Sequence, residues 1–226
     1  MAVATNAWFA IQRLGLGGHR LGYPLLRFSG GRDQMVGPDT EVCIEGYPRS
    51  ANTYAFHGFK LRNADARVAH HLHAPMQVVR AAGLGVPCAV LIRPPLDAVS
   101  SLLIFRGGRL SAGLAIRAYE DFYERVAGVR DQVALCHFDD VLADPAVIAR
   151  ELNRAFGTRF DDRPLDADAR AELVAMIERF DRNRKPDVRR HTVPRAEKET
   201  LKPEARRLVA EHARFPRAVD AYERLV

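Results

Sequence analysis

The sequence has few cysteines, one tryptophan and no long hydrophobic run. The three cysteines, Cys43, Cys88 and Cys136, are isolated and provide neither a disulfide framework nor a Cys-x-x-Cys metal pair. We therefore expect small buried thiols and a reducing, cytoplasmic location. No stretch approaches the roughly 20 apolar residues of a membrane-spanning helix. The first residues also lack the basic and apolar regions of a secretory signal.

The composition is that of an ordinary globular domain. With 226 residues, 47% of them hydrophobic and 27% charged, the chain is long enough for one α/β core, so a single domain over 1–226 is predicted. The net charge of +6 comes with many arginines, which grip phosphate or sulfate bidentately. Because no nucleic-acid-binding motif is recognisable, an anionic small molecule is the expected partner rather than DNA or RNA.

Apolar strand patterns alternate with helical patterns along the chain, which predicts an α/β fold with a parallel sheet of about four to five strands. Strands are expected at 42–44, 67–73, 88–92 and 133–138, and helices at 53–59, 76–82, 95–103, 111–129, 146–156, 166–180, 203–212 and 218–225. Residues 1–40 are expected to form an N-terminal arm with a short helix near 8–16. The segment 139–145 is expected to be a turn, and 181–201 a basic irregular loop.

The most informative stretch is the loop between the first strand and the first helix, Gly46-Tyr-Pro-Arg-Ser-Ala-Asn-Thr53. A strand, a tight loop and a helix start together make a phosphate cradle, because the first N–H groups of a helix have no intrahelical partner. The loop is not a Walker A motif, since the Walker lysine is replaced by Asn52 and the cation stands earlier, at Arg49. That change argues against a nucleoside triphosphate and for a ligand with a single 5′-phosphate.

A second constellation follows the third predicted strand. Arg93 ends that strand, and Ser101 follows eight residues later in the next helix, whereas Ser100 is about 100° away on the helix. Ligands bind at the carboxyl ends of strands in open α/β sheets, so Arg93 and the Arg49 loop are expected to meet in one crevice.

Together these stretches resemble the sulfotransferase family. The segment Tyr47–Tyr54 is similar to the family's 5′-phosphosulfate loop, Tyr-Pro-Lys-Ser-Gly-Thr-Thr-Trp, and Arg93 with Ser101 is similar to its 3′-phosphate motif. The resemblance runs from about 42 to 145 and implies a P-loop NTPase-like fold. It also implies 3′-phosphoadenosine 5′-phosphosulfate as the sulfuryl donor, without a metal. The implied cofactor-binding residues are Arg49, Ser50, Ala51, Asn52, Thr53, Tyr54, Arg93 and Ser101, with Arg189 and Arg190 from the basic run after Arg184-Lys185-Pro186.

The same resemblance suggests a general base. His73 precedes Pro75 by two residues, as the family's catalytic histidine in Lys-Thr-His-Leu-Pro precedes its proline, and His71 then aligns with the family lysine. The implied catalytic residues are His73, Arg49 and His71, with His57 as the second choice for the base. An imidazole suits this role because its ordinary pKa is near ~6.5.

The function expected from these features is in-line transfer of a sulfuryl group to a hydroxyl or amine. The acceptor is a small molecule, a glycan or a lipid, and the arm 1–40 leaves open a contact with a membrane surface. Two alternatives stay open: a P-loop-type small-molecule kinase and a non-catalytic nucleotide-binding protein. The sequence names neither the acceptor nor the oligomeric state.

Overall fold

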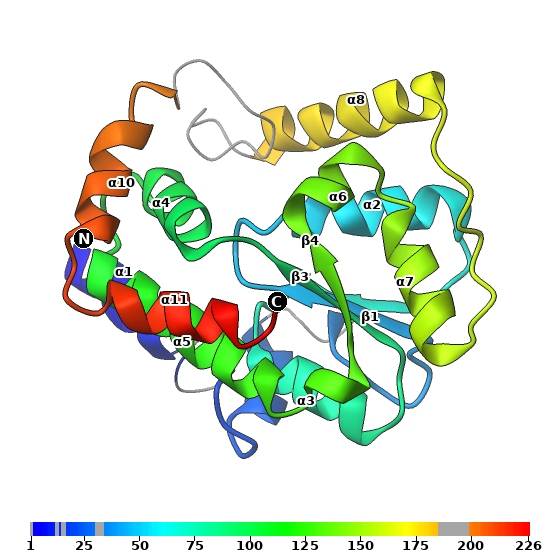
Figure 1. Cartoon of the computed structure of the whole chain (residues 1–226), viewed down its shortest axis with the longest axis horizontal. Coiled ribbons are helices and arrows are strands. Elements are labelled where there is room, and N and C mark those ends of the chain that lie inside the picture. The colour runs from blue at the N-terminus through cyan, green and yellow to red at the C-terminus, as the bar shows by residue number, and fades with distance from the viewer. Residues whose placement is uncertain (1, 12–13, 15–16, 30–33, 185–198) are drawn as a thin grey trace.

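The protein is an α/β structure built on one four-stranded parallel sheet (Figure 1). The computed structural model describes residues 2–11, 14, 17–29, 34–184 and 199–226. The strands are β1 (Val42–Gly46), β2 (Val68–His70), β3 (Cys88–Ile92) and β4 (Ala134–His137), in the order β2-β1-β3-β4. The register pairs Cys43 with Cys88 across β1 and β3, and Val90 with Leu135 across β3 and β4.

Helices cover both faces of the sheet (Figure 1). One face is covered by α3 (Pro75–Gly83), α4 (Pro95–Phe105) and α5 (Ala112–Ala127). The helices α10 (Lys202–Ala210) and α11 (Phe215–Glu223) pack on α4 and α5, and α1 (Ala2–Ala10) lies against α5. The other face is covered by α2 (Asn52–Arg62), α6 (Phe138–Ala143) and α7 (Val147–Phe156), and α8 (Ala167–Arg184) packs on α2. Short 3₁₀ turns, η2 (Tyr23–Ser29) and η4 (Arg130–Gln132), complete the description.

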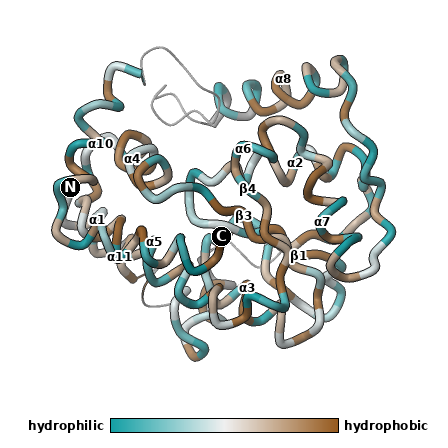
Figure 2. Tube along the Cα trace, in the orientation of Figure 1, coloured by the Kyte–Doolittle hydropathy of each residue, from teal (hydrophilic) through white to brown (hydrophobic). Residues whose placement is uncertain are grey.

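The hydrophobic core is divided between these two faces because successive strand residues point to opposite sides. Cys43, Val90 and Ile92 pack under α4 and α5, whereas Ile44 and Leu91 pack under α2 and α7. Strands β1 and β3 are fully buried. Strand β3 is an unbroken apolar run, whereas the apolar run of β1 ends at Glu45, and Figure 2 shows hydrophobic residues gathered on the central strands. Continuous burial of this kind is typical of parallel sheets covered on both sides.

Most of the expected elements are present, and the three cysteines are buried in β1, β3 and β4 as predicted. Three expectations are wrong. The segment 139–145 is not a simple turn, because α6 follows β4 directly and the turn begins only at Asp144. Helix α8 continues to Arg184, so the start of the expected basic loop is helical. The first helix is α1, at Ala2–Ala10, and therefore begins before the expected position near 8–16.

The N-terminal arm packs on the domain through η2. Tyr23 and Leu26 are buried against Leu72, which precedes α3, and against Met76 in its first turn. None of the helices in the described parts of the chain is long and apolar enough to cross a membrane.

Candidate functional site

The candidate site lies at the carboxyl ends of β1 and β3. The chain leaves β1 to form β2 on one side, and later forms β3 on the other side of β1. The connections from β1 and β3 therefore run in opposite directions, which opens the crevice where ligands bind in open α/β sheets. Arg49 follows β1 and Arg93 follows β3. The two arginines predicted from the sequence therefore lie after the two strands that flank this crevice.

The loop after β1 has an unusual backbone. A Cβ atom on Gly46 would lie 2.8 Å from the carbonyl oxygen of Leu91, so only glycine allows β1 and β3 to approach this closely. Arg49 and Ala51 adopt left-handed φ angles of 72° and 68°. Such angles cost non-glycine residues about 1–2 kcal/mol each and concentrate at functional sites. Helix α2 begins directly afterwards without a side-chain cap, so its first N–H groups face the loop.

The two arginines are joined into one cationic cluster. Arg49 Nε donates to Ser101 Oγ at 3.3 Å, and Arg93 Nη1 donates to the Arg49 carbonyl oxygen at 2.9 Å. Burial, followed by repulsion from Arg93, lowers the pKa of Arg49 to about 10. Both guanidinium groups therefore remain charged at neutral pH, and their proximity favours an anion between them. Ser101, which the sequence grouped with Arg93, accepts from Arg49 in the structure, whereas Ser100 bonds back to the Asp97 carbonyl.

Aromatic rings support both guanidinium groups. The Arg93 guanidinium lies 3.9 Å from the centre of the Phe138 ring, and that of Arg49 lies 5.0 Å from the centre of the Phe105 ring. Cation–π contacts of this kind help to hold an arginine side chain in place. Nothing in the local sequence pattern of Phe138 indicates that it reaches across to Arg93.

The remaining loop residues have mixed environments. Asn52 is buried and its Nδ2 donates to the Tyr47 carbonyl at 3.0 Å, so this amide stabilises the loop itself. Within the described chain, Ser50 Oγ and Asn52 Oδ1 are buried without a hydrogen-bond partner. Thr53 faces the histidines described next. Tyr54 is half-buried near Leu173 and Ile177 of α8, which places it on the α8 side of the loop.

The histidines that follow β2 lie beside this loop. His73 Nδ1 is 2.9 Å from the Gly46 carbonyl oxygen. Since a carbonyl only accepts hydrogen bonds, the proton of neutral His73 sits on Nδ1 and the lone pair on Nε2. His71 Nε2 lies 3.2 Å from Thr53 Oγ1, and both His71 and His73 have left-handed φ angles, 59° and 50°. The structure therefore places His71 and His73 beside the loop that follows β1.

His70 and His57 form the outer part of the histidine cluster. His70 Nδ1 is 2.6 Å from His71 Nδ1, and its ring stacks on Phe56 at 3.8 Å. Burial, with smaller contributions from nearby His57 and Lys60, lowers the pKa of His70 to about 4. Burial also lowers the pKa of His57, which contacts Phe56 edge-on. His71 thus contacts Thr53 at the start of α2, whereas His57 contacts the ring of Phe56.

This environment of His70 predicts acid sensitivity. Folded His70 stays neutral down to a pKa of about 4, whereas in the unfolded chain it takes up a proton below about 6.5. The unfolded state then binds more protons, so stability falls as the pH drops from about 6.5 towards 4. We expect His70→Asn to flatten this slope, by at most about 1.4 kcal/mol per pH unit in unfolding free energy. Urea unfolding at pH 7.5, 6 and 5 measures it, with exposed His19→Asn as control. An unchanged slope in His70→Asn would contradict the assignment.

Three charged residues near the site were not found from the sequence. Asp181, buried near the end of α8, lies close enough to Arg49 to raise its pKa. Arg206 of α10 pairs with Asp97 and lies near Arg93. Glu45, the residue before Gly46, is fully buried and bonded to the histidine segment. Arg189 and Arg190, together with Lys185, lie outside the described residues, and the side chain of Arg184 does too.

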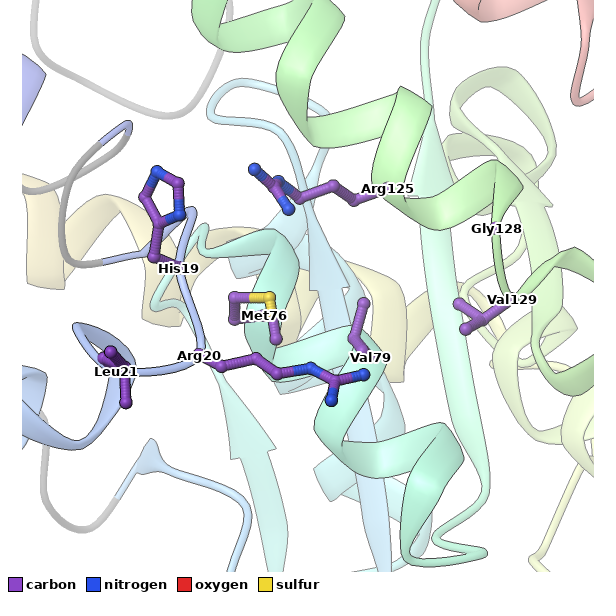
Figure 3. A pocket seen from close by; sticks show the side chains of 8 residues that line it. All are labelled: His19, Arg20, Leu21, Met76, Val79, Arg125, Gly128 and Val129. Carbon is purple, nitrogen blue, oxygen red and sulfur yellow. The ribbon is translucent and has the colours of Figure 1, made fainter.

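A separate surface hollow lies away from these residues (Figure 3). It has a volume of about 650 Å³ and is formed by the segment 19–21, α3 and the end of α5. Arg20 and Arg125 reach over Met76 and Val79 there, and Arg125 also pairs with Asp121. The hollow contains none of the residues predicted for the site.

Comparisons of the chain with protein-family models, curated proteins and solved structures found no match. Any assignment of function therefore depends on the chemistry of the residues just described.

Proposed function

We propose that the protein is a sulfotransferase with a P-loop-like nucleotide site, using 3′-phosphoadenosine 5′-phosphosulfate as donor. The observation that carries the proposal is the junction of Arg49, Arg93 and Ser101 where the strand order reverses. Two cations with separate hydrogen-bonding directions suit a nucleotide with two separate phosphates. A triphosphate chain would instead call for a lysine at the helix start, where this chain has Asn52.

Each phosphate has a group of residues suited to it. The Arg49 guanidinium and the uncapped start of α2 would hold the 5′-phosphate, with Ser50, Ala51 and Thr53 lining the loop. Arg93 and Ser101 would hold the 3′-phosphate. Tyr54, at the side of the loop, would support the adenine. The donor supplies an activated sulfuryl group, and the arginines stabilise negative charge on the leaving side.

His73 is the proposed general base. Its Nδ1–H is engaged by the Gly46 carbonyl, so Nε2 carries the lone pair that removes the proton of the acceptor. When Nε2 takes that proton, the imidazolium keeps its hydrogen bond to Gly46. His71, bonded to Thr53, is proposed to adjust the phosphate loop rather than to take the proton. The acceptor is a hydroxyl or amine of a small molecule, glycan or lipid.

Ligand selectivity tests this proposal. Adenosine 3′,5′-bisphosphate at about 100 times its Kd would stabilise the folded protein by about 2.7 kcal/mol. For a chain of this size that corresponds to a rise in Tm of at least about 5 °C. ADP and ATP-Mg²⁺ are expected to raise Tm much less, because they lack a 3′-phosphate for Arg93. Thermal unfolding followed by circular dichroism measures the effect.

Adenosine 2′,5′-bisphosphate is the matched control, since it has the same charges with one phosphate moved. Equal stabilisation by both bisphosphates would mean that the site binds anions in general and does not recognise a 3′-phosphate. Equal or greater stabilisation by ATP-Mg²⁺ would favour the small-molecule kinase. Selective bisphosphate binding without transfer to any acceptor class would favour a non-catalytic nucleotide-binding protein.

A further inference from the structure

The carboxylate of Glu45 is the most completely enclosed charged group beside the candidate site. Glu45 stands at the end of β1, immediately before Gly46, and its exposed fraction is 0%. An ionisable group in such a position is tolerated only when hydrogen bonds replace the water it has lost. The relevant question is therefore which donors surround it.

Four N–H donors converge on this carboxylate. Oε1 accepts from the Leu72 amide at 2.6 Å and from Gln77 Nε2 at 3.2 Å. Oε2 accepts from the His73 amide at 2.9 Å and from the Gly46 amide at 3.3 Å. Two of the four donors are successive backbone amides of the segment that carries the histidines. Successive amides next to a left-handed residue form a concavity that binds an anion, and here the anion is a side chain of the protein itself.

The same segment has a backbone that needs outside support. His71 and His73 both have left-handed φ angles, which non-glycine residues adopt only where the surroundings hold them. Glu45 bonds to the amide of His73 and to the amide of Leu72, the residue between the two histidines. Glu45 therefore holds the strained turn in place.

Glu45 also fixes the ring of His73 through its neighbour in sequence. The amide of His73 bonds to Glu45, and its ring Nδ1–H bonds to the carbonyl of Gly46. The backbone and the ring of His73 are thus both tied to consecutive residues at the end of β1. Loss of the first tie would move the ring away from the second.

Gln77 connects this arrangement to the N-terminal arm. Its Nε2 donates to Glu45 and to the Gln34 carbonyl, and its Oε1 accepts from the Tyr23 hydroxyl at 2.6 Å and from the Val36 amide at 3.2 Å. The arm therefore contributes to the wall that encloses Glu45. Each polar atom of Gln77 has a partner, so the position of its amide is well determined.

We propose that Glu45 is a positioning residue: its buried carboxylate holds the turn 71–73 so that His73 keeps its proton on Nδ1 and presents Nε2 to the acceptor. The part of this inference that concerns the acceptor depends on the proposed function. The part that concerns the turn and the His73 tautomer does not, and it is testable by itself.

The test compares Glu45→Gln with Glu120→Gln. An amide at position 45 brings an N–H group towards backbone N–H donors, so the turn should open. Glu120, on α5, is a matched control because it is also buried, 6% exposed, and bonds Arg214, the residue before α11, instead of the turn. Both variants should lower Tm. Only Glu45→Gln should change the His73 tautomer, from Nδ1–H alone to a mixture, measured by long-range ¹H–¹⁵N correlation spectra.

Transfer assays give the second readout. Glu45→Gln should lose about 10²-fold in kcat, the usual cost of misplacing a catalytic group by about 1 Å, with little change in bisphosphate Kd. If Glu45→Gln fails to fold, Glu45→Asp replaces it, because its carboxylate stops one methylene short of the turn. A His73 tautomer that stays Nδ1–H in the folded variant would overturn the proposal. If Glu45→Gln changes the tautomer but the wild-type protein transfers no sulfuryl group to any acceptor, the positioning role is supported and the proposed reaction is rejected.

Discussion

Replacing His73 by alanine is expected to lower the rate of sulfuryl transfer by ~10²–10⁴-fold, the usual contribution of a general base. The reason is that His73 Nε2 carries the lone pair while Nδ1–H is held by the Gly46 carbonyl. Affinity for adenosine 3′,5′-bisphosphate should stay the same, because the groups proposed to hold the phosphates are Arg49, Arg93 and Ser101, not His73. Single-turnover transfer and equilibrium binding of the bisphosphate measure the two quantities.

The neighbouring histidines are natural controls for this experiment. His71→Ala should lose less activity, since His71 touches Thr53 of the loop and would act on donor binding. His57→Ala should lose little, because His57 lies against Phe56 on the outer side of the cluster. Near-full turnover in His73→Ala with the true acceptor would mean that the base lies elsewhere and that the alignment of this segment is wrong.

Replacing Arg93 by alanine is expected to weaken the binding of a nucleotide with a 3′-phosphate much more than that of a nucleotide without one. Loss of a charge-assisted contact to the 3′-phosphate costs ~1.5–3 kcal/mol, or roughly 10- to 150-fold in Kd for adenosine 3′,5′-bisphosphate. Adenosine 5′-phosphosulfate lacks that phosphate, so its affinity should hardly change. Isothermal titration of both ligands into wild type and variant measures the difference.

The structure also defines how this second experiment can fail. Arg93 donates to the Arg49 carbonyl, so its removal could loosen the phosphate loop itself. In that case both ligands would weaken equally, and Arg93 would have a structural role instead of a 3′-phosphate contact. Arg109→Ala is the control, because Arg109 is an exposed arginine in the connection after α4.

Local sequence patterns predicted the strands and the loop well because they depend on near neighbours. Strand β3 and the first three residues of β1 are continuously apolar because both faces of the sheet are covered. The loop after β1 was recognisable because Gly46, Arg49 and the start of α2 are close in sequence. Arg93 and Ser101 could be expected at the same edge because parallel strands end on one side.

Local patterns were less reliable where neighbours in space decide the structure. The segment after β4 contains turn-forming aspartates, yet Val141 is buried against the core that α2 and α7 share, which favours the short helix α6. Phe138, at its start, reaches the Arg93 guanidinium. Neither result could be read from the segment alone, because each depends on the packing of β4 beside β3.

The sequence by itself determined the α/β class, the parallel strands, and the two arginine stretches with the serine that follows the second. Only the tertiary structure decided which side chains from distant parts of the sequence lie beside these stretches. Arg206 reaches Asp97 from 109 residues away, Asp181 lies near Arg49, and Glu45 holds the turn that contains His73. The physical reason is that these contacts depend on strand order and helix packing, which bring together residues whose own neighbours in sequence carry no trace of the partner.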